Sequence, residues 1–185
     1  MDNGASSYRR FLDGDKNAFA ELIEMYAHNL IFFINGLVNN LSIAEDLAED
    51  TFCDLIFYKN RFKGKSSLKT YFFSIARNKA FDYIKNNSKV SVMADEELNN
   101  QLADTKELEN KILANERKIC VNKALAGIHS DYRAVLHLLF FEDITYEQAA
   151  IILNKSKKQM KDLVYRAKQA LKVAMEKEGF VYEEL

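Results

Sequence analysis

Apolar residues recur at intervals of three and four along most of the chain, a pattern typical of amphipathic helices. The first expected helix is capped by Asp15, and its apolar stripe comprises Phe19, Leu22, Ile23, Tyr26, Leu30, Phe33, Ile34 and Leu37. The second opens at a capping box of Ser42 and Glu45, and it buries Leu47, Ala48, Phe52, Leu55 and Ile56. After a loop centred on Gly64, the third runs from about residue 68 to 86 and carries Leu68, Phe72, Ile75, Ala76 and Tyr83. We expect these three helices to form one compact domain.

The segment after the third expected helix differs in composition and periodicity. Residues 90–111 are mostly polar and acidic with weak periodicity, and we interpret them as a linker. A helix from about residue 107 then runs up to Gly127, a residue type suited to the left-handed position after a helix end. Another helix is expected to begin at Ser130. The pattern therefore indicates a second helical domain beyond the linker.

The last part of the chain combines a short helix, a turn of about three residues and a longer helix. Thr145 and Gln148 form a capping box for the short helix, and Ser156 and Gln159 form one for the long helix. The long helix carries Met160, Leu163, Val164, Ala167, Leu171 and Ala174 on its apolar face. This order is that of a helix-turn-helix, whose second helix enters the major groove of DNA.

Composition supports this fold class. The 185 residues include no proline and only six glycines, which disfavours sandwiches, barrels and hairpin-rich folds. We therefore predict an all-α protein of two small helical domains, residues 8–89 and 112–178, joined by residues 90–111. Two distant cysteines, Cys53 and Cys120, are expected to be buried small hydrophobes in a reducing cytoplasm, with redox sensing as a less favoured alternative. No apolar run approaches the roughly 20 residues of a membrane span, so we expect no membrane insertion.

The net charge of −1 hides opposite blocks. Residues 8–58 hold three basic and nine acidic side chains, a net of −6. Residues 59–89 hold nine basic side chains and one acid, a net of +8, and residues 155–172 hold seven and one, a net of +6. Residues 90–113 hold six acids and two lysines, a net of −4. Two basic patches separated by an acidic stretch indicate two docking surfaces for a polyanion.

The second basic block lies on the longer helix of the helix-turn-helix. Its basic and aromatic side chains around the N-terminal half are Lys157, Lys158, Lys161, Tyr165, Arg166 and Lys168. Positive side chains and the helix dipole both favour phosphate there. A lone basic helix would more simply be a solvated surface face, but the capped turn before it and the other basic block favour DNA binding.

Two segments resemble a known family. SIAEDLAEDTF and RFKGKSSLKTYFFSIARNKAFDYIKNN are similar to region 2 of the extracytoplasmic-function (ECF) group of sigma-70-type sigma factors. IHSDYRAVLHLLFFEDITYEQAAIILNKSKKQMKDLVYRAKQALK is similar to their region 4. The resemblance implies a dissociable subunit that binds RNA polymerase core enzyme and directs promoter recognition and transcription initiation. It also implies an anti-sigma factor as a further partner.

The resemblance also implies roles for particular residues. The positions that dock on core polymerase are Asp46, Glu49, Asp50 and Phe52, which would otherwise be a capped, solvated acidic helix face. The positions expected to bind the minus-ten element are Lys63, Lys65, Tyr71, Arg77, Asn78 and Lys85. Asn78 can pair with an exposed base edge, and Tyr71 is the aromatic residue expected to stack on unpaired bases.

The minus-thirty-five element is expected to face Lys161, Asp162, Tyr165, Arg166 and Lys168, together with Lys157 and Lys158 at the helix start. Where the family usually carries Gly-Thr-Val at the start of this helix, the chain has Lys158, Gln159 and Met160, so the promoter sequence cannot be carried over. Asp162 is the acid of this block. It can accept from cytosine N4, or it can pair with Lys158 and Arg166 four residues away.

Two other classes of function remain as alternatives. A stand-alone helix-turn-helix regulator would use only the C-terminal half and leave residues 8–89 without a task. An enzyme is disfavoured because His28, His129 and His137 are scattered and no phosphate loop or nucleophile elbow is present. We therefore expect no catalytic residues, no metal, no cofactor and no small-molecule substrate.

Overall fold

The computed structural model describes residues 4–88 and 121–179, and every regular element within them is a helix. The first domain contains α1 (Ala5–Leu12), α2 (Lys16–Val38), α3 (Leu41–Phe57), the 3-10 turn η1 (Lys59–Arg61) and α4 (Leu68–Ser88). The second contains a helical segment at 121–126, then α6 (Ser130–Phe140), α7 (Tyr146–Leu153) and α8 (Lys157–Lys177). The prediction of two helical domains is confirmed. The expected linker and the expected helix before residue 121 lie outside the described residues.

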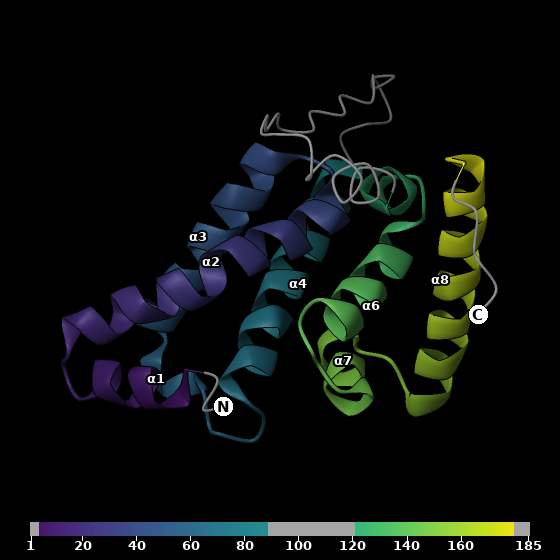
Figure 1. The fold of residues 1–185 in the computed structure, drawn as a ribbon. Coiled ribbons are helices and arrows are strands. Elements are labelled where there is room, and N and C mark those ends of the chain that lie inside the picture. The colour runs from purple at the N-terminus through teal and green to yellow at the C-terminus, as the bar shows by residue number, and fades with distance from the viewer. Residues whose placement is uncertain (1–3, 89–120, 180–185) are drawn as a thin grey trace, which may run out of the picture.

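The first domain is built around α2, which packs against α1, α3 and α4 (Figure 1). Asp15 caps α2 as predicted, by accepting from the backbone N–H of Asn17 at 2.9 Å. The predicted stripe of α2 is buried except at two positions, since Phe19 is half-buried and Ile23 is exposed. An aromatic cluster forms the centre of this core, in which the ring of Phe72 lies 4.9 Å from Tyr26 and 5.4 Å from Phe52.

Several local predictions for this domain were wrong. The N-cap of α3 is Asn40, whose side chain accepts from the N–H of Ile43, so Ser42 and Glu45 are not its capping box. Ile56, expected in the core, is exposed, and so is Cys53. The helix α1 was not predicted, because it is short and no side chain caps its N-terminus.

In the second domain, α6 packs against α8, and α7 packs against both (Figure 1). Both predicted capping boxes are present, at Thr145 with Gln148 and at Ser156 with Gln159. Gly127 follows the helical segment as expected, but its φ is not positive, and its N–H donates to the carbonyl of Lys123. Left-handed conformations occur instead at Asn39 and Asn154, the C-caps of α2 and α7, because asparagine tolerates positive φ better than most residues.

The two domains pack against each other. Helix α6 lies against α2, and α7 lies against α4 (Figure 1). Buried apolar residues of both domains belong to one continuous cluster. The core therefore runs through the interface between the domains.

Candidate nucleic-acid interface

The turn between α7 and α8 positions the basic helix. Asn154 ends α7 in the left-handed conformation with φ 52° and ψ 50°, and Ser156 begins α8 by accepting from the N–H of Gln159. Met160, Val164 and Ala167 are buried and fix α8 on the domain. Leu163, Leu171 and Ala174 are partly buried beside this stripe, and the opposite face of α8 is turned outward.

All seven residues predicted to face the minus-thirty-five element are exposed on α8. They are Lys157, Lys158, Lys161, Asp162, Tyr165, Arg166 and Lys168. Tyr165 is 67% exposed, an unusual position for an aromatic side chain without a partner molecule. Lys168 places its ammonium 5.4 Å from the ring centroid of Phe140 on α6. The face combines positive charge with an exposed ring, which suits contact with phosphates and base edges.

Asp162 makes no ion pair within 4.0 Å with Lys158 or Arg166 in the described part of the chain. Its carboxylate is exposed among basic side chains of α8. The intrahelical pairing considered for this residue is therefore not formed in the structure.

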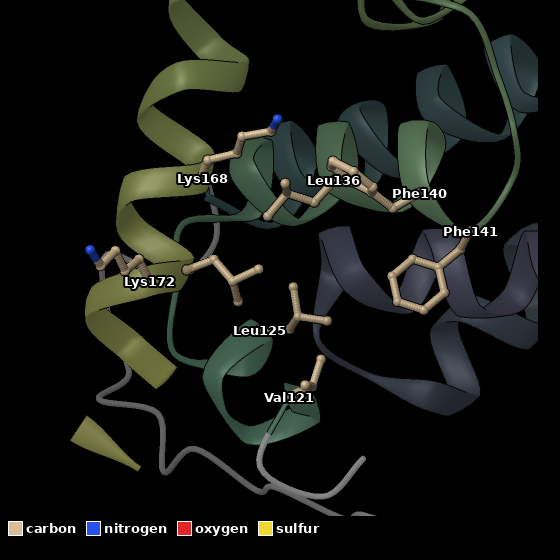
Figure 2. A pocket seen from close by; sticks show the side chains of 8 residues that line it. Val121, Leu125, Leu136, Phe140, Phe141, Lys168 and Lys172 are labelled. Atoms are coloured by element: carbon tan, nitrogen blue, oxygen red, sulfur yellow. The ribbon is translucent and has the colours of Figure 1, made fainter. Parts of the chain in front are cut away.

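Next to α8 lies an apolar hollow of about 270 Å³. Its lining combines two lysines with apolar side chains from three helical segments: Val121, Leu125, Leu136, Phe140, Phe141, Lys168, Leu171 and Lys172 (Figure 2). Lys168 extends toward Leu136 and Phe140, whereas the ammonium group of Lys172 points away from the hollow (Figure 2). Small-molecule sites usually need several convergent polar groups to orient a ligand, and this hollow lacks them.

The first basic block lies on the loop before α4 and on α4 itself. Lys63 and Lys65 are exposed on either side of Gly64, and Asn78 and Lys85 are exposed on α4. Of three successive aromatic residues, Phe72 and Phe73 are fully buried. Tyr71 is half-buried, with its ring 5.1 Å from Phe62, and burial is the main cause that raises its phenol pKa. Tyr71 is thus the one of these three rings that reaches the surface.

Arg77 and Asn78 are held together on α4. The guanidinium of Arg77 lies 4.0 Å from the ring centroid of Phe81, and its Nη1 donates to Asn78 Oδ1 at 3.2 Å. The side-chain carbonyl of Asn78 accepts this hydrogen bond, and its NH2 group points in another direction. The pair therefore presents donors at a fixed place on α4.

The acidic face of α3 differs from its prediction at one residue. Asp46, Glu49 and Asp50 are exposed, but Phe52 is only 7% exposed and packs edge-on against Phe19 and Phe72. Phe52 is thus a core residue rather than part of the docking surface. Its position on the predicted apolar stripe already indicated this.

The structure adds two residues to the same face. Cys53 and Phe57 continue the stripe of Asp46, Glu49 and Asp50, because they follow Asp46 by seven and eleven residues. Phe57 is 76% exposed. Helical spacing alone could have identified this apolar extension, but the sequence pattern assigned the neighbouring Ile56 to the core.

The described residues hold no group of three or more His, Cys, Asp and Glu side chains that could bind a metal ion. None of the helices in 4–88 and 121–179 has both the length and the apolar character needed to cross a membrane.

Family models and known proteins agree with this arrangement. Residues 22–90 match the model of sigma-70 region 2, and residues 118–171 match a model of sigma-70 region 4. The chain is 25% identical over 156 residues to the ECF RNA polymerase sigma factor SigM of Bacillus subtilis, covering 82% of this chain and 91% of that protein. It is 26% identical over 171 residues to the RNA polymerase sigma-H factor of Pseudomonas aeruginosa, covering 88% and 89%.

Solved structures show the same fold. The sigma factor RpoE of Bartonella quintana, determined in complex with the anti-sigma factor NepR, matches with a TM-score of 0.66 at 23% identity, over 85% of this chain and 96% of that one. CnrH, determined with the cytosolic domain of CnrY, matches with a TM-score of 0.61 at 16% identity, over 94% and 95%.

The two matched regions, in this order, define a sigma factor of the sigma-70 family. Within that family, the chain belongs to the ECF group. It functions as an ECF sigma factor in transcription initiation. A stand-alone helix-turn-helix regulator is not favoured, because the N-terminal half matches region 2.

Proposed function

We propose that this sigma factor binds core polymerase and the two promoter elements through three separate surfaces. The acidic face of α3 binds core polymerase, the loop before α4 together with α4 captures the minus-ten strand, and α8 binds the minus-thirty-five duplex. The first two belong to a domain of residues 8–89 and the third to a domain of residues 112–178, with residues 90–111 between them. The observation that carries the proposal is which side chains of these segments are exposed and which are buried. Asp46, Glu49 and Asp50 of α3, Lys63, Lys65 and Lys85 in and after the loop, and the charged residues of α8 are exposed, whereas neighbouring Phe52, Phe72 and Phe73 form the core.

The core-binding surface comprises Asp46, Glu49, Asp50 and Phe57. Carboxylates beside an exposed ring are typical of an interface with a basic partner surface, because the charges guide association and the ring is buried on contact. Asp54, farther along α3, is paired with Lys79 at 3.2 Å and is therefore occupied within the domain.

The test is a pull-down of core enzyme with purified variants. We expect Asp46→Arg to weaken core binding by at least about tenfold, because the new cation opposes the basic surface that the carboxylate would contact. Glu24→Arg, at an exposed position of α2, is the matched control and should bind normally. Undiminished binding by folded Asp46→Arg protein would remove α3 from the polymerase interface.

Strand capture and duplex binding require different side chains. Unpaired bases are bound by stacking and by hydrogen bonds to their edges, which Tyr71 and Asn78 can supply. Duplex DNA is bound through phosphates and major-groove edges, which suits the lysines, Tyr165 and Arg166 of α8. The N-terminal basic block therefore serves the melted minus-ten element, and the C-terminal block serves the closed duplex.

Regulation by an anti-sigma factor fits this division. One structural neighbour was determined in complex with the anti-sigma factor NepR, and the other in complex with the cytosolic domain of CnrY. We propose that the chain acts in the cytoplasm, has no catalytic activity of its own and is held by a protein partner until a signal releases it. Purification from uninduced native cells should recover this partner, and recovery of polymerase alone would contradict it.

A further inference from the structure

The interface between the two domains encloses an aromatic cluster around a histidine. His137 of α6 is buried, and its ring stacks on Phe32 of α2 at 5.1 Å and on Phe141 at 5.6 Å. Phe33 of α2 and Phe73 of α4 lie at 5.8 and 6.5 Å. The cluster thus unites rings from both domains, with His137, Phe33 and Phe73 buried and Phe32 and Phe141 at its exposed rim.

A buried carboxylate lies beside this cluster. Glu142, two residues after α6, is only 3% exposed. Its Oε2 lies 2.9 Å from Lys69 Nζ and accepts from Asn29 Nδ2 at 3.1 Å. Lys69 Nζ also donates to the backbone carbonyl of Glu142 at 2.6 Å. Both partners belong to the first domain, so these hydrogen bonds exist only while the domains are together.

Glu142 is ionised in this environment. Burial alone would raise the pKa of its carboxyl group, but the neighbouring His137 imidazole and the Lys69 ammonium outweigh that effect and lower the pKa. His137 Nε2 lies 3.2 Å from Glu142 Oε1, although neither ring nitrogen has a well-aligned hydrogen-bond partner in the described structure. A buried charge of this kind adds little net stability, but losing one partner is costly because the other charge stays buried. The contact therefore specifies how the domains dock.

Lys69 belongs to the basic block assigned to strand capture. It lies in the first turn of α4, between Lys65 on the loop and Tyr71 on the helix. In the docked arrangement its side chain is only 19% exposed, and α7 packs along α4. A carboxylate offers a cation two acceptor oxygens, as the phosphate of a nucleic acid does. In the docked arrangement, the Glu142 carboxylate is therefore bound to Lys69, a cation of the strand-capture surface.

Promoter geometry requires the domains to separate. The minus-ten and minus-thirty-five elements are named for positions about 25 base pairs apart, which is about 85 Å of B-DNA at about 3.4 Å per base pair. A compact chain of this length has a radius of gyration of only about 16 Å. The docked molecule cannot reach both elements, so the contact at Glu142 must open during promoter binding.

We propose that Glu142 is an intramolecular competitor of the promoter strand. Its carboxylate occupies Lys69 and Asn29 in the free protein, and the phosphate backbone of the minus-ten strand takes its place when the domains separate. Lys69 is accordingly a phosphate-binding residue that is masked in the docked arrangement. The inference rests on the proposed function in one respect, the assignment of strand capture to α4 and the preceding loop.

The first experiment measures domain separation in the full chain without DNA. Dyes are attached at Ser42→Cys and Gln169→Cys, two exposed positions on α3 and α8, in a background with Cys53→Ser and Cys120→Ser. Single-molecule energy transfer should show a compact population in the parent and a shift to a longer distance in Glu142→Ala. Glu147→Ala, at an exposed position of α7, should leave the distribution unchanged. An unchanged distribution in folded Glu142→Ala protein would overturn the proposal, whatever the protein does on promoters.

The second experiment measures binding of a fluorescein-labelled single-stranded DNA of mixed sequence by anisotropy. An open state populated at about 10% or less weakens apparent affinity at least about tenfold, so Glu142→Ala should tighten binding by about that factor. Lys69→Ala also breaks the contact, but it removes the phosphate ligand. The double variant should therefore be open and bind more weakly than Glu142→Ala, with a salt dependence smaller by about 0.7 in slope for one lost contact.

The experiments distinguish failure of this inference from failure of the proposed strand-capture function on which it rests. Opening by Glu142→Ala with unchanged DNA affinity, or an unchanged salt slope in the double variant, would overturn the role of Lys69 and Glu142 as competitor and ligand. Failure of the proposed strand-capture surface would appear instead as normal promoter melting by Asn78→Ala holoenzyme, which the energy-transfer measurement does not involve.

Discussion

The two basic surfaces of this protein hold their cations in different ways. On α8, the lysines and Arg166 are exposed, and Lys168 lies over the ring of Phe140. On α4, several cations are already engaged within the protein: Lys69 with Glu142, Arg77 with Phe81 and Asn78, and Lys79 with Asp54. The difference indicates that α8 can meet duplex DNA as it stands, whereas α4 must exchange internal partners for DNA.

The two helices also differ in their share of the core. Helix α4 contributes fully buried Phe72 and Phe73, so it is both a structural element and a binding surface. Helix α8 contributes smaller side chains, Met160, Val164 and Ala167. Substitutions on α4 must therefore be chosen to separate folding from binding, and those on α8 affect mainly binding.

The largest effect is expected from Phe72→Ala. It removes a ring that contacts Tyr26 and Phe52 and should lower the free energy of unfolding of the first domain by about 3–5 kcal/mol. Tyr165→Ala, which removes an exposed ring from α8, should change it by no more than about 0.5 kcal/mol. Urea unfolding followed by circular dichroism measures both. Equal losses would contradict the contrast between α4 and α8.

A smaller effect, on selectivity rather than stability, is expected from Asp162→Ala. If its carboxylate accepts from cytosine N4, the variant should lose about 1–3 kcal/mol of preference at one cytosine, while its overall DNA affinity stays equal or rises. Selection from randomised minus-thirty-five duplexes, with wild type and variant in parallel, measures this. Identical preferences at every position would leave Asp162 without a base-reading role.

On α4, Asn78→Ala should impair promoter melting more than initial duplex binding. Loss of one hydrogen bond to an exposed base should slow open-complex formation by about tenfold, equivalent to about 1.4 kcal/mol. Permanganate footprinting of the holoenzyme reports melting, and gel shift reports the closed complex. Asn86→Ala, at an exposed position near the end of the same helix, is the matched control. Normal melting with Asn78→Ala would refute a base-contacting role.

The smallest effect concerns the start of each helix. Ser156→Ala removes the cap of α8 and should cost about 1 kcal/mol of stability. Ser42→Ala should cost little, because Asn40 caps α3. Thermal unfolding of the pair measures the difference, and a greater loss with Ser42→Ala would show that the cap of α3 is misassigned.

Much of the fold could be predicted from local pattern. The apolar stripe of α2, the cap at Asp15 and the boxes at Thr145 and Ser156 depend on residues within four positions of one another, so the sequence contains all the information needed. The cap of α3 was wrong because Asn40 and Ser42 are both good caps two residues apart, and local chemistry does not choose between them.

Long-range contacts could not be predicted in this way. Phe52 was expected both on the apolar stripe of α3 and at the docking face, and only the packing of α3 on α2 and α4 decides for the core. Glu142 and Lys69 are 73 residues apart, and neither belongs to a motif that pairs them. The exposed DNA-facing residues of α8 needed only a helical period, whereas the masking of Lys69 needed the arrangement of two domains.

The separation of Lys69 and Glu142 along the chain also determines when the contact can form during synthesis. A ribosome adds about 5–20 residues per second, so the 73 residues between them take about 4–15 s to synthesise. The first domain is complete at the end of α4, so for most of that interval it has its lysine but not the carboxylate that covers it. The newly made domain is therefore open to polyanions for several seconds, and its closure awaits the synthesis of the second half of the chain.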